Sequence, residues 1–281
     1  MHPINFFFDI DDTLVLHFDK KEWKKQTEEI VELYGEEFLE KHTVWAIDYP
    51  HFIFPGIPTL WRWLYGQGHR LAMFSSAVQE RNEELADNLM PIVFGEESPK
   101  VRPRVKVLSR KDCFDTRLTG HMFDYQPIFS GNYKKVLSGV VVPPEEMPWS
   151  FLIDDDRSYM ALHEEYNYIR VETGLSLSPL SADSFKDHAY LYKAFYMAGL
   201  FKAIFERIEA EHVTAVEAAK FIQIDSSGQP FDVSFFYHST INDIRFYEEG
   251  ERILSTVDPE VRIPEKVMRR MKANDYDTER E

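Results

Sequence analysis

The chain has 281 residues, of which 44% are hydrophobic and 15% aromatic, a composition that supports a large core and excludes a disordered protein. Its net charge of -16 disfavours non-specific attraction to phosphate backbones, so we expect no nucleic-acid partner. A single cysteine, Cys113, excludes an internal disulfide.

The chain opens with an apolar run that ends in acids. Residues 4–8 are typical of a strand buried on both faces of a parallel sheet, and Asp9, Asp11 and Asp12 follow directly. Because carboxylates so close together repel one another, they are best explained at the carboxyl end of the strand with a cation beside them. That edge is also where open α/β sheets bind ligands.

Strand and helix patterns alternate over residues 4–172. Helices are expected at 19–41, 58–67, 78–89, 131–137 and 158–164, and further strands at 70–74, 92–94, 149–153 and 168–171. This alternation predicts an α/β fold with a Rossmann-like parallel sheet flanked by helices. The predicted core domain spans residues 1–174, with a small insertion at 16–54 and an irregular one at 95–130.

Residues 175–281 have a different character. After a linker rich in serine and proline, the pattern is mainly helical, with helices expected at 185–207, 214–222 and 239–255, a loop at 225–230 and a frayed tail from 269. No stretch is apolar enough for a transmembrane span, and this extension is a candidate for binding a protein partner or a membrane surface. Since no classical signal peptide is visible, we expect a cytoplasmic protein, with non-classical export left open.

Carboxylates at two strand ends suggest phosphoryl-transfer chemistry. Asp9 and Asp11 are two positions apart, so on an extended chain their side chains leave from the same side. One carboxylate can attack phosphorus while the other moves protons. Asp154 and Asp155 end another predicted strand, and together these acids suit Mg²⁺, which prefers hard oxygen ligands and phosphate oxygens.

Hydroxyl and ammonium groups for holding a phosphate are also present. Ser75 follows the second predicted strand and supplies a hydroxyl, while Lys134 or Lys135 supplies a cation. We assign Thr13, Ser76 and Lys134 to substrate binding. The basic residues between 100 and 111 are interpreted either as a solvated surface or as a contact for a substrate phosphate or acidic partner.

The motif Asp9-Ile10-Asp11-Asp12-Thr13 resembles the first motif of the haloacid dehalogenase superfamily of aspartate-nucleophile phosphatases. The runs 71–75, 134–135 and 152–155 are similar to the other three motifs of that superfamily, in the same order. This resemblance implies a Rossmann-like core, Mg²⁺ and an aspartyl-phosphate intermediate. By position, Asp9 is then the nucleophile and Asp11 the acid/base, and Asp9, Asp154 and the Asp11 carbonyl are metal ligands.

Residues 131–138 are further similar to a run in the RNA polymerase C-terminal-domain phosphatases, an alignment that selects Lys135 as the catalytic lysine. The chain departs from those enzymes in the inserted stretch 115–130. The resemblance is nearest to the protein phosphatases of the superfamily that have no cap or a minimal one, including magnesium-dependent phosphatase-like proteins. It implies catalysis by Asp9, Asp11, Ser75 and Lys135 with Mg²⁺ held at Asp9, Asp11, Asp154 and Asp155.

The substrate is predicted from the length of the insertion. Residues 16–54 are too few for a full helical cap, so the site is expected to be open to a large substrate, and a phosphoprotein carrying phosphotyrosine or phosphoserine/threonine is the first hypothesis. A small-metabolite phosphatase with a short helical cap is the second. A non-catalytic interaction protein on a phosphatase-like fold is the third, and the retention of all the motif residues argues against it.

Overall fold

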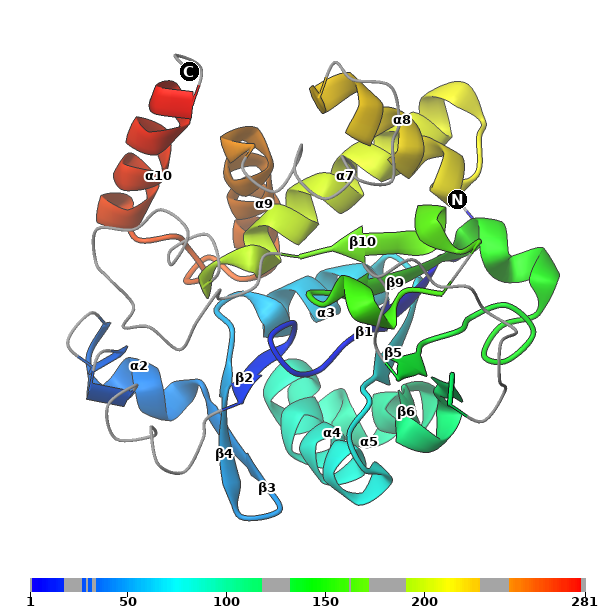
Figure 1. Cartoon of the computed structure of the whole chain (residues 1–281). Helices are drawn as coiled ribbons and strands as arrows, with labels where there is room; N and C mark the ends of the chain where they lie inside the picture. The colour runs from blue at the N-terminus through cyan, green and yellow to red at the C-terminus, as the bar shows by residue number, and fades with distance from the viewer. Residues whose placement is uncertain are drawn as a thin grey trace.

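The computed structural model describes residues 2–17, 27–28, 30–31, 34–117, 132–161, 163–171, 191–227 and 243–278. At its centre is a five-stranded parallel sheet in the order β10-β9-β1-β5-β6, flanked by helices (Figure 1). Its strands are β1 (Asn5–Phe8), β5 (Arg70–Phe74), β6 (Lys106–Leu108), β9 (Ser150–Asp154) and β10 (Tyr168–Arg170). The α/β class and the parallel sheet predicted from the sequence are therefore confirmed.

The register of the three central strands sets the position of the acids. Phe8, the last residue of β1, pairs with Ile153 of β9 on one side and with Met73 of β5 on the other. The next residues along β1 and β9 are Asp9 and Asp154, so both acids reach the carboxyl edge of the sheet at the same level.

The two faces of the sheet are covered differently. Phe6 and Phe8 point into a large core shared with α3 (Ile57–Gly66), α4 (Gln79–Phe94) and α7 (Lys193–Glu211). Phe7 points to the opposite face, into a smaller core with apolar residues of segment 137–160. This alternation follows from the strand geometry, in which successive side chains leave on opposite faces.

The insertion after β1 contains strands that were not predicted from the sequence. β2 (Val15–His17), β4 (Tyr49–Ile53) and β3 (Thr43–Ala46) form an antiparallel sheet in that order. The short helix α2 (Glu36–Lys41) lies between β2 and β3 in the chain. The β3–β4 hairpin turns at Ile47 and Asp48, which have φ values of 47° and 59°. An isoleucine in such a turn is unusual, because the left-handed conformation is normally left to glycine, asparagine or aspartate.

Two predictions between β5 and β9 were wrong. Residues 92–94, expected as a strand, form the last turn of α4, which continues past Pro91 and ends at Phe94, with Gly95 as its C-cap. The strand that follows β5 in the sheet is β6, which lies inside the stretch 95–130 that was predicted to be irregular. Its first residue is exposed and the other two are half-buried, as suits an edge strand, so the continuous apolar run of a central strand is missing.

Two predicted helices are also absent from the described residues. Tyr133–Lys134 form strand β8, which pairs with β7 (Phe114–Asp115), in place of a helix at 131–137. Around 158–164 there is only the 3₁₀ turn η7 (Arg157–Tyr159). The remaining short elements are η1 (Gly95–Glu97), α5 (Ser98–Val101), η2 (Arg102–Arg104), η3 (Arg110–Asp112), η6 (Pro144–Trp149) and η8 (Glu165–Asn167).

The C-terminal region is helical, as predicted. It comprises α7, α8 (Ala215–Ser227), α9 (Ile244–Val257) and α10 (Glu265–Thr278). Residues 225–227, which were predicted to begin a loop, are therefore helical. Most of the tail that was expected to be frayed is also a helix. The predicted serine- and proline-rich linker and the start of the first helix, before residue 191, lie outside the described residues. Where the chain is described, no helix combines the length and apolar character needed to cross a membrane.

The C-terminal helices pack on the sheet and on each other. Phe201 of α7 lies with its ring centroid 4.7 Å from that of Phe6 in β1. α7 and α9 meet at Gly199 and Gly250, where an added Cβ would come within 2.0 Å of the Phe246 oxygen and 1.7 Å of the Phe195 oxygen, respectively. Only glycine allows two helix backbones to approach so closely.

Candidate active site

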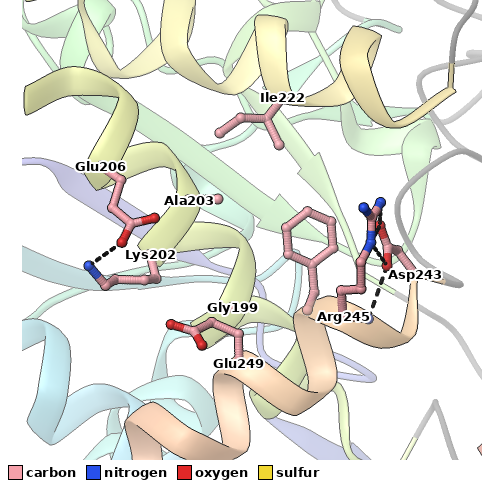
Figure 2. A pocket seen from close by; sticks show the side chains of 9 residues that line it. Gly199, Lys202, Ala203, Glu206, Ile222, Asp243, Arg245 and Glu249 are labelled. Atoms are coloured by element: carbon pink, nitrogen blue, oxygen red, sulfur yellow. Dashed lines mark hydrogen bonds and ion pairs between the residues drawn. The ribbon is translucent and has the colours of Figure 1, made fainter. Parts of the chain in front are cut away.

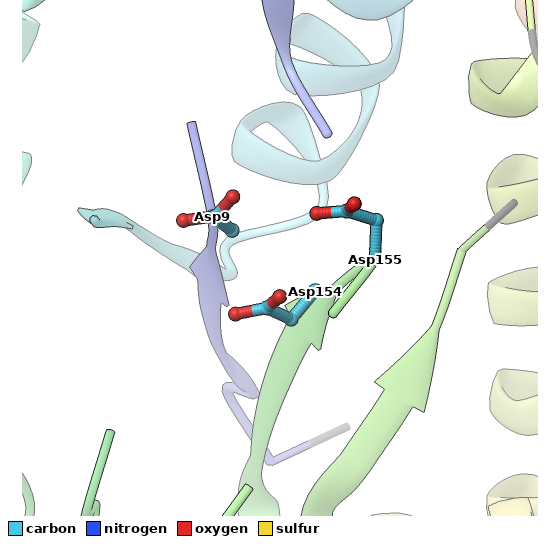
Figure 3. A group of neighbouring side chains, drawn as sticks. All are labelled: Asp9, Asp154 and Asp155. Carbon is cyan, nitrogen blue, oxygen red and sulfur yellow. The ribbon is translucent and has the colours of Figure 1, made fainter. Parts of the chain in front are cut away.

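Three carboxylates gather at the carboxyl edge of the sheet. Asp9 follows β1, Asp154 ends β9 and Asp155 comes next, and their nearest oxygen atoms all lie within 4.8 Å of one another (Figure 3). Asp9 and Asp154 are buried and Asp155 is half-buried. The strand register explains this arrangement, because it brings the ends of β1 and β9 side by side.

Lys135 joins two of these acids. Its ammonium donates to Asp9 Oδ1 and to Asp154 Oδ2, each at 2.5 Å, and has no exposed side-chain surface. It also lies 4.6 Å from the centroid of the Tyr159 ring. Burial alone would lower the pKa of Lys135, but the carboxylates of Asp154 and Asp9 reverse that effect and hold its pKa well above the usual value. Lys135 is therefore a permanently charged counterion of the cluster.

The cluster retains more negative charge than Lys135 can balance. Burial raises the pKa of Asp9 to about 6 even though Lys135 opposes the shift. Burial, followed by the charge of Asp9, raises the pKa of Asp155 to about 7. Removal from water and mutual repulsion both disfavour the ionised forms. A divalent cation with oxygen ligands would relieve this repulsion, so the donor set fits Mg²⁺.

Asp11 lies at the same edge but has different partners. Its carboxylate accepts hydrogen bonds from Arg81, through Nη2 to Oδ1 and through Nη1 to Oδ2 at 3.0 Å, and a longer one of 3.4 Å from Ser75 Oγ. The Asp11 carboxylate is not part of the three-acid group. The chain bends after Asp9 and turns through Asp12, which has a φ of 56°, so the extended geometry assumed for residues 9–11 does not hold.

Arg81 is held from its other side by a histidine. Its Nη2 lies 3.0 Å from Nε2 of the buried His51, and His51 Nδ1 lies 3.0 Å from the Tyr49 carbonyl. Because Arg81 can only donate, Nε2 accepts and Nδ1 carries the proton, which makes the ring neutral. Neither residue was predicted to belong to the site, since an isolated arginine has no motif around it and His51, which lacks metal-ligand spacing, was expected to have a solvated or core role.

The other predicted site residues, Ser75, Ser76 and Thr13, differ in their hydrogen-bond partners. Ser75 Oγ, besides its contact to Asp11, accepts a hydrogen bond from the Ala77 amide at 3.1 Å. Ser76 Oγ lies 2.9 Å from the Tyr159 hydroxyl. Thr13 is fully buried, and its hydroxyl has no hydrogen-bond partner among the described residues. Such a group can accept or donate to a bound ligand.

Lys134 and Lys135 have separate environments although they are neighbours. The Lys134 ammonium donates to the Ser158 carbonyl, and burial lowers its pKa to about 8, with Asp156 opposing the shift. Only Lys135 bridges Asp9 and Asp154. Adjacent residues of an extended segment point to opposite sides, which explains why one lysine faces the acids and the other does not.

A second lysine reaches the site from the C-terminal region. Lys193, at the start of α7, is buried, and its ammonium donates to the Asp12 carbonyl. Burial raises the pKa of Asp155, and the charge of Lys193 opposes that rise. This contact could not be found from motifs, because the two residues are far apart in the chain.

The basic residues between 100 and 111 serve several roles. Arg102 pairs with Glu83 and with Asp87, the latter at 2.7 Å. Arg110 lies next to the site and donates to the Ser76 carbonyl at 2.8 Å. The stretch therefore does not act as one uniform patch, and part of it has a structural role.

A cavity of about 360 Å³ lies away from the acids, among α7, α8 and α9 (Figure 2). Its charged groups are paired locally: Lys202 with Glu206 at 2.7 Å and Arg245 with Asp243 at 2.6 Å. Because these ion pairs already neutralise its walls, the cavity offers no concentrated charge comparable with the acid cluster.

The fold and the site together define an α/β protein with a carboxylate and lysine cluster at the carboxyl edge of its parallel sheet. No family model and no curated protein matches the chain. A solved structure of Fcp1, an essential RNA polymerase II CTD phosphatase, is similar at 14% identity and a TM-score of 0.38, covering 95% of this chain and 69% of that one. An Fcp1 variant from fission yeast, bound to beryllium fluoride, is similar at 12% identity and a TM-score of 0.40 with the same coverage. Similarity this low carries no argument about activity, which has to be made from the site itself.

Proposed function

We propose that this protein is a Mg²⁺-dependent phosphomonoester hydrolase of the haloacid dehalogenase type, with Asp9 as its nucleophile. The observation that carries the proposal is the buried Asp9 carboxylate, grouped with Asp154 and Asp155 and paired with Lys135 at the end of β1. Buried acids around a permanent cation, at the edge where α/β sheets bind ligands, favour electrostatic chemistry on a phosphate.

The residues present can complete a balanced reaction. Asp9 attacks phosphorus, the bond from phosphorus to the ester oxygen breaks, and the departing oxygen takes a proton from Asp11. The resulting aspartyl-phosphate is hydrolysed when Asp11 removes a proton from water and the water oxygen attacks phosphorus. The bond to Asp9 then breaks, which restores its carboxylate and releases phosphate. Bound at Asp9, Asp154, Asp155 and the Asp11 carbonyl, Mg²⁺ would offset the negative charge of the phosphate.

Neighbouring groups support these roles. Lys135 holds Asp9 in place and keeps a positive charge beside it. Ser75 and the unpartnered hydroxyl of Thr13 are suited to hydrogen bonding with phosphate oxygens. Arg81 pairs with Asp11 before substrate binds, so we infer that the approach of a phosphate loosens this pair and frees Asp11 for proton transfer.

A phosphoprotein remains our first candidate substrate. The side chain of Asp11, the proposed donor to the leaving group, is 37% exposed, whereas Asp9 and Asp154 are buried. The leaving group would therefore lie on the open side of the site, where a large substituent can be accommodated. The antiparallel sheet formed by β2, β4 and β3 also supports this choice over a helical cap.

A substrate panel tests the proposal directly. Phosphotyrosine and phosphoserine/threonine peptides, phosphorylated metabolites and p-nitrophenyl phosphate are assayed with and without Mg²⁺. We expect Mg²⁺-dependent turnover, fastest on peptides, and its loss in Asp9→Asn. Asp12→Asn is the matched control: Asp12 has no assigned catalytic role, and asparagine tolerates its positive φ. Full turnover by Asp9→Asn would remove the catalytic interpretation, and faster turnover of metabolites would favour the second candidate.

A further inference from the structure

Lys193 is an unusual residue for the beginning of a helix. It has no exposed surface, its ammonium donates to the backbone carbonyl of Asp12, and it lies 4.4 Å from the centroid of the Phe54 ring. Burying an ammonium has a large desolvation cost, which is offset only by fixed partners. Among the described residues it links α7 directly to the turn that follows the nucleophile strand.

That turn is tightly constrained. The Asp12 amide donates to the Val15 carbonyl at 2.8 Å, and the Val15 amide donates back to the Ile10 carbonyl at 3.0 Å. Asp12 itself has the left-handed φ of 56°. A hydrogen bond to its carbonyl fixes the Asp12–Thr13 peptide plane and so helps to hold the turn that begins directly after Asp11.

Lys193 and Lys135 contact different parts of the candidate site. Lys135 bridges Asp9 and Asp154, whereas Lys193 donates to the Asp12 carbonyl in the turn that follows Asp9. The two lysines come from different parts of the chain, one from segment 132–137 and the other from α7. The turn therefore has this buried cation as a partner only when the C-terminal region is in place.

We propose that Lys193 is a positioning residue of the active site, through which helix α7 holds the turn carrying Asp11 and Asp12 in its catalytic conformation. This inference rests on the function proposed above. It makes the C-terminal region a part of the catalytic unit, because its first described helix supplies a contact that the sheet and its insertions do not provide.

The test compares Lys193→Met with Lys193→Gln and with a control, Lys202→Met. Lys202 lies on the same helix, but its side chain is 33% exposed and it pairs with Glu206. In Lys193→Met we expect kcat to fall about 10- to 100-fold with KM nearly unchanged, because a misplaced catalytic group slows the reaction more than it weakens binding. Lys193→Gln, which keeps a donor for the Asp12 carbonyl, should retain more activity, and Lys202→Met should match the wild type.

Measurements of stability and of metal binding distinguish a positioning role of Lys193 from a purely structural one. Methionine places an apolar group where the ammonium lies over the Phe54 ring and removes the desolvation cost of a buried charge, so the thermal unfolding midpoint of Lys193→Met should change little. Mn²⁺ binding, measured by calorimetry, should be retained, since the three acids remain. A wild-type kcat in both Lys193 variants would overturn the inference, as would a parallel loss of Mn²⁺ binding and turnover. If Lys193→Met does not fold, the kcat of Lys193→Gln decides, and a fall no greater than that of Lys202→Met overturns the inference.

The experiment also separates this inference from the proposed function. If wild-type turnover depends on Asp9 but not on Lys193, only the positioning role fails. If the wild type hydrolyses no phosphomonoester, the proposed function fails as well.

Discussion

Replacing Lys135 by methionine should leave two buried carboxylates without their counterion. The lysine ammonium lies 2.5 Å from both Asp9 and Asp154, and neither Lys135 nor Asp154 has exposed side-chain surface. Removing one partner of a buried ionic network typically costs about 3–5 kcal/mol, since the charge left behind is neither solvated nor paired. We expect a loss of this size at pH 8 in the absence of divalent metal.

The loss should depend on pH in a defined direction. Burial already raises the pKa of Asp9 to about 6, and without Lys135 the pKa values of Asp9 and Asp154 rise further. In the unfolded chain both groups titrate near 4. The folded variant therefore binds protons more tightly than the unfolded one, so the destabilisation is full at pH 8 and shrinks as the pH falls towards 5.

Urea unfolding with EDTA at pH 5 and pH 8 measures this effect. For an m-value of roughly 3 kcal/mol/M, the midpoint of Lys135→Met at pH 8 should lie about 1 to 1.7 M below that of the wild type. Adding Asp154→Asn to Lys135→Met should restore part of the loss by removing one stranded charge, and excess Mg²⁺ should do the same. An equal loss at both pH values, or no recovery in the double variant, would refute the reasoning.

Two further predictions concern the third acid and the helix crossing. The pKa of Asp155 is raised to about 7, above its unfolded value, so its carboxylate reduces stability progressively as the pH rises from about 4 to 7. In EDTA, the thermal stability of Asp155→Asn relative to the wild type should therefore increase as the pH rises over that range. A stability difference that does not change with pH would contradict this. Gly199→Ala should lower the free energy of unfolding by about 3 kcal/mol, because its methyl group would meet the backbone of α9. Gly66→Ala, a helical control with open space around it, should be neutral or gain up to about 1 kcal/mol, and equal stability of the two variants would argue against the close crossing.

The central strands could be predicted because burial on both faces leaves a continuous apolar run. Residues 4–8, 70–74 and 149–153 carry such runs, and β1, β5 and β9 coincide with them to within a residue. The parallel arrangement then brings their carboxyl ends to one edge, so the proximity of Asp9 and Asp154 followed from the pattern alone.

The remaining elements lack a local signal of their own. Residues 92–94 are as apolar as a strand, but they extend a helix whose inward face includes Val93. Lys106–Leu108 carries a charge because it lies at the sheet edge, and strands β7 and β8 have two residues each, too few to show a period. In each case tertiary contacts decided the conformation over local propensity.

The acids of the candidate site and Lys135 were expected from short motifs, but two other cations beside it, Arg81 and Lys193, were not. Asp9, Asp11 and Asp154 stand in short motifs, whereas Arg81 and Lys193 are single basic residues on helices. Their roles come from partners that are distant in the chain, Asp11 for Arg81 and the Asp12 carbonyl for Lys193. No periodicity or spacing encodes such a pairing before the fold is known.

The register that places Asp9 beside Asp154 has a consequence for how such a chain can diverge. The site depends on where β1 and β9 end relative to one another and not on the length of the segments between them. Loops tolerate insertions at a small entropic cost, whereas shifting one strand by a single residue turns its side chains to the other face. A lineage can therefore exchange nearly everything that joins the strands and still keep the acids in place. A chain built in this way can lose recognisable similarity over its whole length while its few strand-end residues stay fixed.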